Sequence, residues 1–370
     1  MKISPVFTAL LIVTALLLAG CNQPATPATP VTTVSPSPSP ELPSEVPTAV
    51  PTPSLTPVTT TSVQPAGTPD PNLRLETYVP EKAWQGMTVL ADNHDLSRPR
   101  IIEVNMKGEI TWEYDLPAEL RTYTNPGLDT EPLPNGNILF LLPRNGVYEI
   151  TRGKQVAWKY LDPKVSHDAD RLPNGNTLIA FGGGDTMDDM QVKEVNPAGT
   201  IVWSWQAKSA FNHAPYLGIS TEGWTHTNAV TRLSNGNTLV SLRNFNLIAE
   251  VDPSGKLVRT LCEGLCREQH DPEVQANGNI LFANHGNPQA AIEMAPDGTV
   301  VWQYTISDQK AWPVRDVNRL PNRNTLITGA DRIIEVTPDN EVAWALRLSG
   351  VTFGSPQEAP ARGFYKAVRF

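Results

Sequence analysis

Histidine side chains stand at the start of two related segments in the middle of the chain. The first is HTNAVTRLSNGNTLVSLRN at 226–244, and the second is QHDPEVQANGNILFANHGN at 269–287. A neutral imidazole can act as a nucleophile, hold a metal ion or exchange a proton. The first segment adds the amide of Asn228 and the guanidinium of Arg243, both of which can bind an anion. These residue types predict an anion-binding or group-transfer site, provided that the fold brings them together.

The skeleton of these segments recurs along the chain, and the repeat identifies the elements that must position the side chains. The turn motif occurs as LPNGNILF at 133–140, LPNGNTLI at 172–179, LSNGNTLV at 233–240, QANGNILF at 275–282 and LPNRNTLI at 320–327. Each copy continues with a second strand pair, whose last strand carries Trp except in the copy that begins at His226, where Arg259 takes its place. Asn-Gly favours a two-residue type I′ hairpin turn. Each unit therefore predicts four short antiparallel strands.

Repeats of this length and strand number pack radially around an axis. One such sheet cannot bury both of its faces alone, so the repeat predicts an all-β, six-bladed β-propeller of four-stranded antiparallel blades with Trp between neighbours. An antiparallel sandwich is the alternative. The first unit, which begins at WQGMTVLAD, lacks an inner strand, whereas the C-terminal GFYKAVRF alternates like one. We expect residues 363–370 to close the ring as the innermost strand of the first blade.

Equivalent positions on the innermost strands predict which side chains meet in the channel. The position six residues before the residue that precedes the Asn of each turn holds Leu128, His167, Asn228, His270 and Arg315. His226 lies two residues before Asn228 and therefore on the same face of its strand. A two-residue turn at Asn-Gly places Asn228 opposite Arg243, and His270 opposite His285. The predicted site therefore comprises His167, His226, Asn228, Arg243, His270, His285 and Arg315.

Three interpretations of this histidine cluster remain open at the level of the sequence. The cluster can bind an anion, or three of its histidines can hold a zinc ion with Asp168 and Asp271 as supporting acids. Alternatively, the histidines are structural and bond to those neighbouring aspartates. His94 and His213 fall outside the register and receive no role.

The first 72 residues have a different composition. Residues 1–20 predict a lipoprotein signal peptide, because an apolar run ends in LAGC, which resembles a lipobox that would leave a lipid on Cys21. An ordinary signal peptide with a chance cysteine is the alternative. Residues 21–72 are rich in Pro, Thr and Ser and predict a disordered tether, followed by the propeller domain at 73–370. We expect an exported bacterial lipoprotein, anchored to the outside of the cell membrane or in the periplasm.

Charge and cysteine content narrow the possible partners. The net charge of −9 argues against nucleic acid and anionic membrane surfaces. We therefore expect contact with the membrane only through the lipid anchor. We also expect a monomer. Setting Cys21 aside leaves Cys262 and Cys266 as an even pair in an exported protein, which predicts a small disulfide-closed loop. Half of a metal site is the alternative for this pair.

The segments HDADRLPNGNTLI at 167–179 and HTNAVTRLSNGNTLVSLRN, the strands that carry Trp and the closing FYKAVRF resemble the bacterial arylsulfate sulfotransferases. The resemblance covers about residues 73–370, and these enzymes are exported six-bladed propellers. It implies that the chain moves a sulfuryl group from an aryl sulfate to a phenol through a sulfohistidine, with no nucleotide donor. We expect no cofactor and assign no metal ligand.

The same resemblance implies a role for each site residue. His270 is expected to be the nucleophile, and His167 matches the supporting histidine of an earlier blade. His226, Asn228 and Arg243 match the family's sulfate-binding residues. The pair Cys262 and Cys266 resembles the family's short disulfide loop. His285 and Arg315 are expected to contact substrate from their channel positions. A surface-anchored binding propeller without turnover, an envelope scaffold and a quinone-dependent dehydrogenase are the rival functions.

Overall fold

The computed structural model describes residues 65–124, 127–306, 313–349 and 362–370. The predicted signal peptide, Cys21 and the tether as far as residue 64 lie outside the described residues. The described chain begins within the stretch predicted as tether, where Thr68 pairs with Ile110 in an isolated bridge. Within the described residues, no helix is long and apolar enough to cross a membrane.

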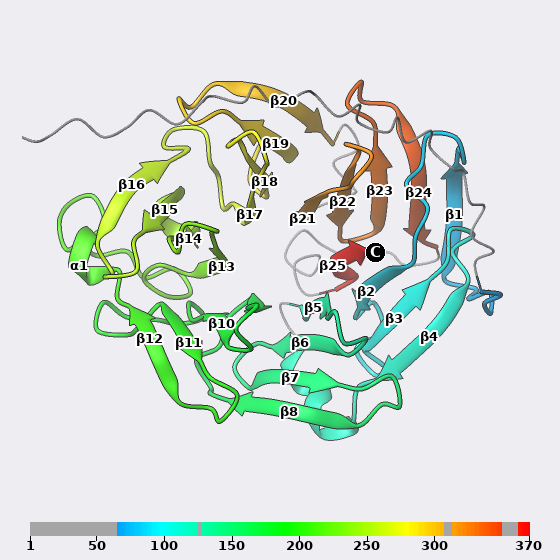
Figure 1. Ribbon diagram of the computed structural model, residues 1–370, viewed down its shortest axis with the longest axis horizontal. Helices are drawn as coiled ribbons and strands as arrows, with labels where there is room; N and C mark the ends of the chain where they lie inside the picture. The colour runs from blue at the N-terminus through cyan, green and yellow to red at the C-terminus, as the bar shows by residue number, and fades with distance from the viewer. Residues whose placement is uncertain (1–64, 125–126, 307–312, 350–361) are drawn as a thin grey trace, which may run out of the picture. The chain divides into compact units, whose positions relative to one another are not determined.

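Six antiparallel sheets surround a central axis, as the repeat predicts (Figure 1). The strands of each blade are given from the innermost outward. Blade one contains β25 (Phe364–Arg369), β2 (Thr88–Asp92), β3 (Arg100–Val104) and β4 (Ile110–Asp115), and blade two contains β5 (Asp129–Pro132), β6 (Ile138–Leu142), β7 (Gly146–Ile150) and β8 (Val156–Leu161). Blade three contains β9 (Ala169–Arg171), β10 (Thr177–Ala180), β11 (Val192–Val195) and β12 (Ile201–Trp205).

The remaining three blades follow in chain order. They are β13 (Thr227–Arg232), β14 (Thr238–Leu242), β15 (Leu247–Val251) and β16 (Leu257–Leu261); β17 (His270–Val274), β18 (Ile280–Asn284), β19 (Ala290–Met294) and β20 (Val300–Thr305); and β21 (Val314–Arg319), β22 (Thr325–Gly329), β23 (Arg332–Val336) and β24 (Val342–Leu348). Blade six carries an unpredicted fifth strand, β1 (Leu73–Tyr78), which pairs antiparallel with the outer edge of β24.

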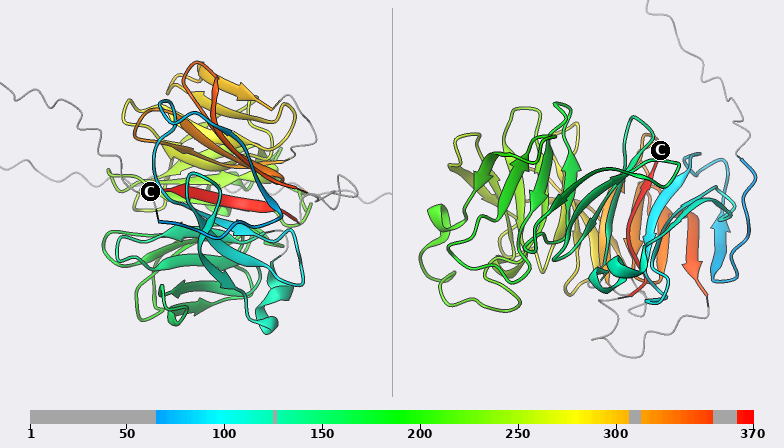
Figure 2. Two further views of the ribbon diagram at one scale, coloured as in Figure 1. Left: turned by 90° about the vertical axis from the view of Figure 1, so that its right-hand side faces the viewer. Right: turned by 90° about the horizontal axis from the view of Figure 1, so that it is seen from below.

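The C-terminal strand closes the ring, which confirms the prediction. β25 pairs antiparallel with β2 and lies in the inner part of the ring (Figure 2, red). Phe364 and Ala367 are fully buried, and the Arg369 guanidinium forms a buried ion pair with Glu335 of blade six. The first and last blades are therefore joined by apolar packing and by charge.

The hairpin turns differ from the prediction, and the register differs with them. In blade four the Leu233 amide donates to Asn237 O at 2.8 Å, and the Gly236 amide donates to Leu233 O at 2.9 Å. This is a three-residue loop, a type I turn followed by Gly236 at φ 88°. The pairing shifts by at least one residue relative to a two-residue loop. The predictions that Asn228 faces Arg243 and that His270 faces His285 are wrong; His270 pairs with Ala283.

The recurring sequence has a structural explanation within each blade and between blades. The second Asn of each turn donates from Nδ2 to a Glu on the third strand, as in Asn176 to Glu194 at 2.6 Å. Except for Glu250 of blade four, that Glu also pairs with an Arg from the next blade, as in Arg232 to Glu194 at 2.7 Å. The same guanidinium lies over the Trp203 ring at 4.8 Å. The turn Asn and the third-strand Glu of one blade therefore form a contact that the Arg of the next blade completes.

The tryptophans occupy the contacts between blades, as predicted. Each of five indole N–H groups donates to a backbone carbonyl in the outer turn of the next blade, at 2.9–3.2 Å: Trp112 to Arg152, Trp158 to Pro197, Trp203 to Pro253, Trp302 to Pro338 and Trp344 to Met106. Blade four has Arg259 in place of Trp, and this Arg pairs within its own blade with Glu250 at 2.7 Å. The contact between blades four and five instead contains Cys262 and Cys266 in its apolar core.

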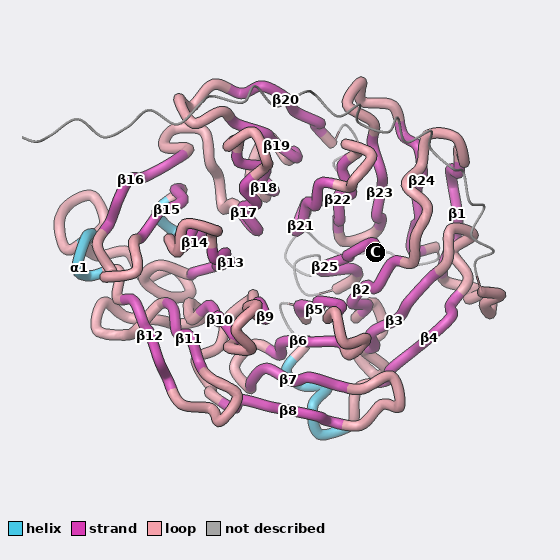
Figure 3. Tube along the Cα trace, in the orientation of Figure 1, coloured by secondary structure: helices cyan, strands magenta, loops and turns pink. Residues whose placement is uncertain are grey.

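Helical turns are confined to connections (Figure 3). Within the described residues these are η1 (Ala118–Tyr123), α1 (Lys208–Phe211) and η2 (Arg243–Phe245). The connection that contains α1 precedes His226, and η2 begins at Arg243. The two connections therefore approach the predicted site at one end of the fourth blade.

Candidate active site

Two layers of polar side chains from the innermost strands line the centre of the ring. The first layer contains Tyr365, His167, Asn228, His270 and Arg315, and the second contains Lys366, Asp129, Asp168, Asp271 and Asp316; Ala229 completes the lining. The cavity between them measures about 10 Å³, which is roughly the space of one water molecule. A larger ligand must therefore approach the first layer from the end of the channel where Arg243, Glu222 and Glu268 lie, which is called the mouth.

β-bulges allow adjacent residues of one strand to face the channel together. The register shifts at Asn228 in β13, at Asp271–Pro272 in β17, at Arg315 in β21 and at Tyr365–Lys366 in β25. A bulge places two residues opposite one and redirects a side chain. This explains why neighbouring residues appear in both layers although a regular strand alternates.

His270 is held in one orientation by the segment before it. Its Nδ1 lies 2.9 Å from the carbonyl oxygen of Glu268, which can only accept, and 3.2 Å from Asn228 Nδ2. The shorter contact favours the tautomer with the proton on Nδ1 and the lone pair on Nε2. The ring stacks on His285, with centroids 4.9 Å apart and planes at 17°. The predicted meeting of His270 and His285 therefore occurs, although the two are not cross-strand partners. A nucleophilic nitrogen is thus available at Nε2.

His226 is oriented by its backbone as well as by its ring. Its Nδ1 lies 3.2 Å from Glu222 O, and its ring centroid is 4.9 Å from that of His167. Its backbone has φ 47°, a left-handed conformation that costs energy for a residue other than glycine. The buried carboxylate of Asp185 accepts the amides of Thr225 and His226 at 3.1 Å and stabilises this conformation. Asp185 is a positioning residue that the sequence reasoning missed.

Asn228 and the two predicted arginines belong to the cluster in different ways. Asn228 Nδ2 donates to Gln269 O at 3.0 Å, whereas its Oδ1 is buried without a hydrogen-bond partner among the described residues. Arg243 lies at the mouth, and its charge helps to lower the pKa of each histidine in the cluster. Arg315 is buried and donates to Phe364 O at 2.6 Å, so it also anchors the closing strand.

The histidines of the cluster are neutral at physiological pH. Burial, followed by the charge of nearby arginines, lowers the pKa of His226 to about 4 and that of His285 to about 3. Burial and neighbouring imidazoles lower the pKa values of His167 and His270 well below the usual range. A neutral imidazole is the nucleophilic form, so the cluster is prepared for attack on an electrophile without prior deprotonation.

The pKa of His226 predicts a measurable dependence of stability on pH. The folded value of about 4 lies below the unfolded value of 6.5, so only the unfolded state gains this proton between those values. The stabilisation is complete above pH 6.5 and is lost as the pH falls toward 4. Between pH 7.5 and pH 5.0 we expect wild type to lose about 2 kcal/mol more stability than His226→Gln. Urea denaturation at both pH values measures this difference, and equal losses in the two proteins contradict it.

The aspartates beside the histidines have partners other than the histidines. Asp168 accepts the Val230 amide at 2.8 Å and lies 3.1 Å from Lys366 Nζ, which also lies 3.2 Å from Asp129 and 3.5 Å from Asp271. These contacts join inner strands of different blades. The aspartates therefore do not support the histidines as zinc ligands or bond to them structurally. Within the described residues, no group of three His, Cys, Asp or Glu side chains is arranged as a metal site.

Tyr365 occupies the first-layer position of blade one and was missed because its strand comes from the far end of the chain. Its ring centroid lies 6.3 Å from that of His167, and its hydroxyl is buried without a hydrogen-bond partner among the described residues. A Cβ atom on Gly127 would lie 2.0 Å from the Tyr365 ring, so glycine is required there. Alignment of FYKAVRF with the other innermost strands is the sequence signal that could have identified Tyr365 as a channel residue.

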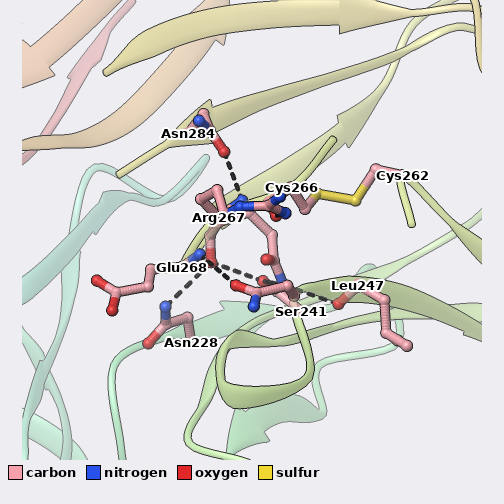
Figure 4. Close-up of a disulfide and its surroundings, with 10 residues drawn as sticks. Asn228, Ser241, Leu247, Cys262, Cys266, Arg267, Glu268 and Asn284 are labelled. Atoms are coloured by element: carbon pink, nitrogen blue, oxygen red, sulfur yellow. Dashed lines mark hydrogen bonds between the residues drawn. A yellow bond between two sulfur atoms is a disulfide. The ribbon is translucent and has the colours of Figure 1, made fainter. Parts of the chain in front are cut away.

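The predicted disulfide between Cys262 and Cys266 is present and leads directly into the site (Figure 4). After Cys266, the Arg267 amide donates to Asn284 Oδ1 at 2.7 Å. Gln269 Nε2 donates to Leu247 O at 2.7 Å, and Gln269 O accepts from Ser241 Oγ at 2.9 Å. The segment that supplies the carbonyl for His270 is therefore fixed on both sides.

Similarity to one solved structure supports the fold. A protein of unknown function from Bacteroides caccae is 20% identical, with a TM-score of 0.56 over 73% of this chain and 96% of its own. A catalytically inactive virginiamycin B lyase from Staphylococcus aureus with quinupristin is 13% identical, over 74% and 87% of the two chains, with a TM-score of 0.48. No curated protein matches the chain.

The arylsulfotransferase (ASST) family model matches residues 76–263, which is 188 of the 370 residues. The matched region contains His167, His226, Asn228 and Arg243. With the six-bladed fold that surrounds these residues, the match establishes that the chain belongs to the arylsulfotransferase family.

Proposed function

We propose that the protein transfers a sulfuryl group from an aryl sulfate to a phenol through a covalent adduct on His270. Membership of the arylsulfotransferase family supports the reaction class. The observation that carries the choice of nucleophile is the contact of His270 Nδ1 with Glu268 O, which leaves the lone pair of Nε2 available in a neutral ring. His270 also belongs to the first layer of the channel.

The first step forms the Nε2–S bond and breaks the bond between sulfur and the aryl oxygen. The electron pair of the broken bond leaves with the phenolate, and the Nδ1 proton stays directed at Glu268 O. In the second step, the acceptor phenol releases its proton to solvent, the resulting phenolate attacks sulfur, and the electron pair of the N–S bond returns to Nε2. Two steps at one nucleophile mean that donor and acceptor need not be bound together.

Charge on the sulfuryl oxygens requires fixed donors near His270. Arg243 supplies a guanidinium at the mouth, and Asn228 supplies an amide from the neighbouring inner strand. His226 and His167 present neutral rings beside them. In this proposal the neutral imidazoles position the anion, and the arginine stabilises the developing charge.

The test is incubation of the propeller domain with 4-nitrophenyl sulfate, with and without phenol. We expect release of 4-nitrophenolate that depends on phenol, together with phenyl sulfate as product. A protein that binds the donor without releasing 4-nitrophenolate would instead be a binding propeller. A protein that neither binds nor turns over aryl sulfates contradicts the proposal.

The disulfide provides a further prediction for the proposed reaction. Replacing both Cys262 and Cys266 with Ser removes a loop constraint worth only about 2 kcal/mol by chain entropy, so the protein should stay folded. Activity should fall at least about tenfold, because the segment that orients His270 loses one of its anchors. A thermal melt and the 4-nitrophenyl sulfate assay measure the two effects. Full activity in the folded variant contradicts a positioning role.

We also propose that the mature chain is exported and carries a lipid on Cys21. The support is the LAGC sequence and the Pro-rich stretch that follows it, both outside the described residues. Mass spectrometry of the native N-terminal peptide tests this proposal. An unmodified N-terminus at another residue contradicts it.

A further inference from the structure

Two glutamates at the mouth of the site contact both the arginine and the oriented histidines. The Glu268 carboxylate lies 3.3 Å from Arg243 NH2, and the Glu222 carboxylate lies 3.7 Å from Arg243 NH1 and 3.9 Å from His226 Nδ1. The carbonyl oxygens of the same two residues are those that orient His270 and His226. The two carboxylates are therefore held close to the reacting groups by the backbone that builds the site.

The two carboxylates face solvent, whereas the arginine between them is mostly covered. The side chains of Glu222 and Glu268 are 71% and 44% exposed, and that of Arg243 is 17% exposed. One guanidinium thus balances only one of two carboxylates. When a sulfuryl oxygen binds the guanidinium, it competes with both carboxylates for this charge, and the mouth becomes more negative.

We propose, on the basis of the function proposed above, that Glu222 and Glu268 select acceptors that carry a positive charge, namely phenols with an ammonium group. The charge on such an acceptor meets the two carboxylates at the mouth while its phenolic oxygen approaches the sulfuryl group inside. An acceptor with a carboxylate is repelled by the same pair. Complementary charge at an entrance raises the association rate and discriminates against like charge.

The experiment compares three acceptors of similar size with 4-nitrophenyl sulfate as donor. Tyramine carries an ammonium group, 4-methylphenol is neutral and 4-hydroxyphenylacetate carries a carboxylate. We expect wild type to have a kcat/KM for tyramine at least about tenfold above that for 4-hydroxyphenylacetate at low salt, and a smaller ratio at 0.5 M NaCl.

Variants assign this preference to the two side chains. The double variant Glu222→Gln, Glu268→Gln keeps both carbonyls, and the tyramine to 4-hydroxyphenylacetate ratio should fall to within about twofold of one. Glu263→Gln, at an exposed glutamate in the disulfide loop, removes one negative charge outside the mouth and should leave most of the ratio. Because the readout is a ratio, a general loss of activity does not affect it.

The outcomes separate this inference from the function on which it rests. Transfer to all three phenols with a ratio near one in wild type, or a large ratio that survives in the double variant, overturns the acceptor preference and leaves the transferase function intact. No transfer to any phenol overturns both.

Discussion

His270→Ala is expected to abolish transfer from 4-nitrophenyl sulfate, with a loss of at least about 10⁴-fold, because the variant lacks the atom that forms the bond to sulfur. Rapid quenching of wild type with donor alone should trap an adduct of about 80 Da on the peptide that carries His270, with one equivalent of phenolate released. Peptide mass spectrometry and a stopped-flow burst measure these two results. The thermal melt of the variant should show that the fold is intact.

Two companion variants distinguish the nucleophile from its surroundings. Arg243→Ala should retain some turnover, with a loss of about 10²–10³-fold, because it removes charge stabilisation and not the bond-forming nitrogen. His213→Ala is the matched control, since this exposed histidine bonds through Nδ1 to Ala214 O, packs against Tyr216 and is not among the residues that line the channel. Normal turnover by His270→Ala, or a wild type that gives neither burst nor adduct, contradicts the covalent mechanism.

Deletion of residues 363–370 is expected to prevent stable folding. It removes the innermost strand of blade one, exposes the edge of β2 and takes the buried Phe364 out of the core between the first and last blades. It also removes Lys366, the ammonium that lies near three channel carboxylates. Thermal melting and size-exclusion chromatography measure the effect, and we expect aggregation or the loss of a cooperative transition.

A point substitution separates the closing contact from the loss of a whole strand. Arg369→Met leaves the buried Glu335 carboxylate without its guanidinium, so we expect a loss of about 3–5 kcal/mol in the free energy of unfolding. Arg74→Met, on the exposed outer strand β1, should change stability by at most about 0.5 kcal/mol. For the deletion of residues 363–370 described above, a truncated protein that melts like the intact one rules out closure of the ring by β25.

Local patterns in the sequence were sufficient to predict the architecture and part of the site. Turn motifs and alternating apolar residues predict blade number and strand order because each blade repeats the same local burial. The inner-strand positions of His167, Asn228 and His270 follow from counting back from the turn, and this count does not depend on the turn type. The closing strand was predictable because blade one visibly lacks its inner member.

The tertiary structure alone decided how the site residues meet. The turn has three residues and not two, because Gly236 takes the left-handed position after a type I turn, and this difference moves every cross-strand pair. Asp168 was adjacent to a histidine in sequence, yet it bonds to Val230 of the next blade. Tyr365 enters the channel from the C-terminal end of the chain.

Periodicity in the sequence thus determined the six blades, the strand that closes them and the histidines on the channel strands, since these depend on which residues of one unit are buried. It could not determine that Asp185 would hold the backbone of His226, or that Glu222 and Glu268 would meet at Arg243. Those contacts join segments about 20 to 40 residues apart along loops without a repeat. Only closure of the ring and packing of the loops bring such side chains within bonding distance, so the tertiary structure decided the chemistry at the mouth of the channel.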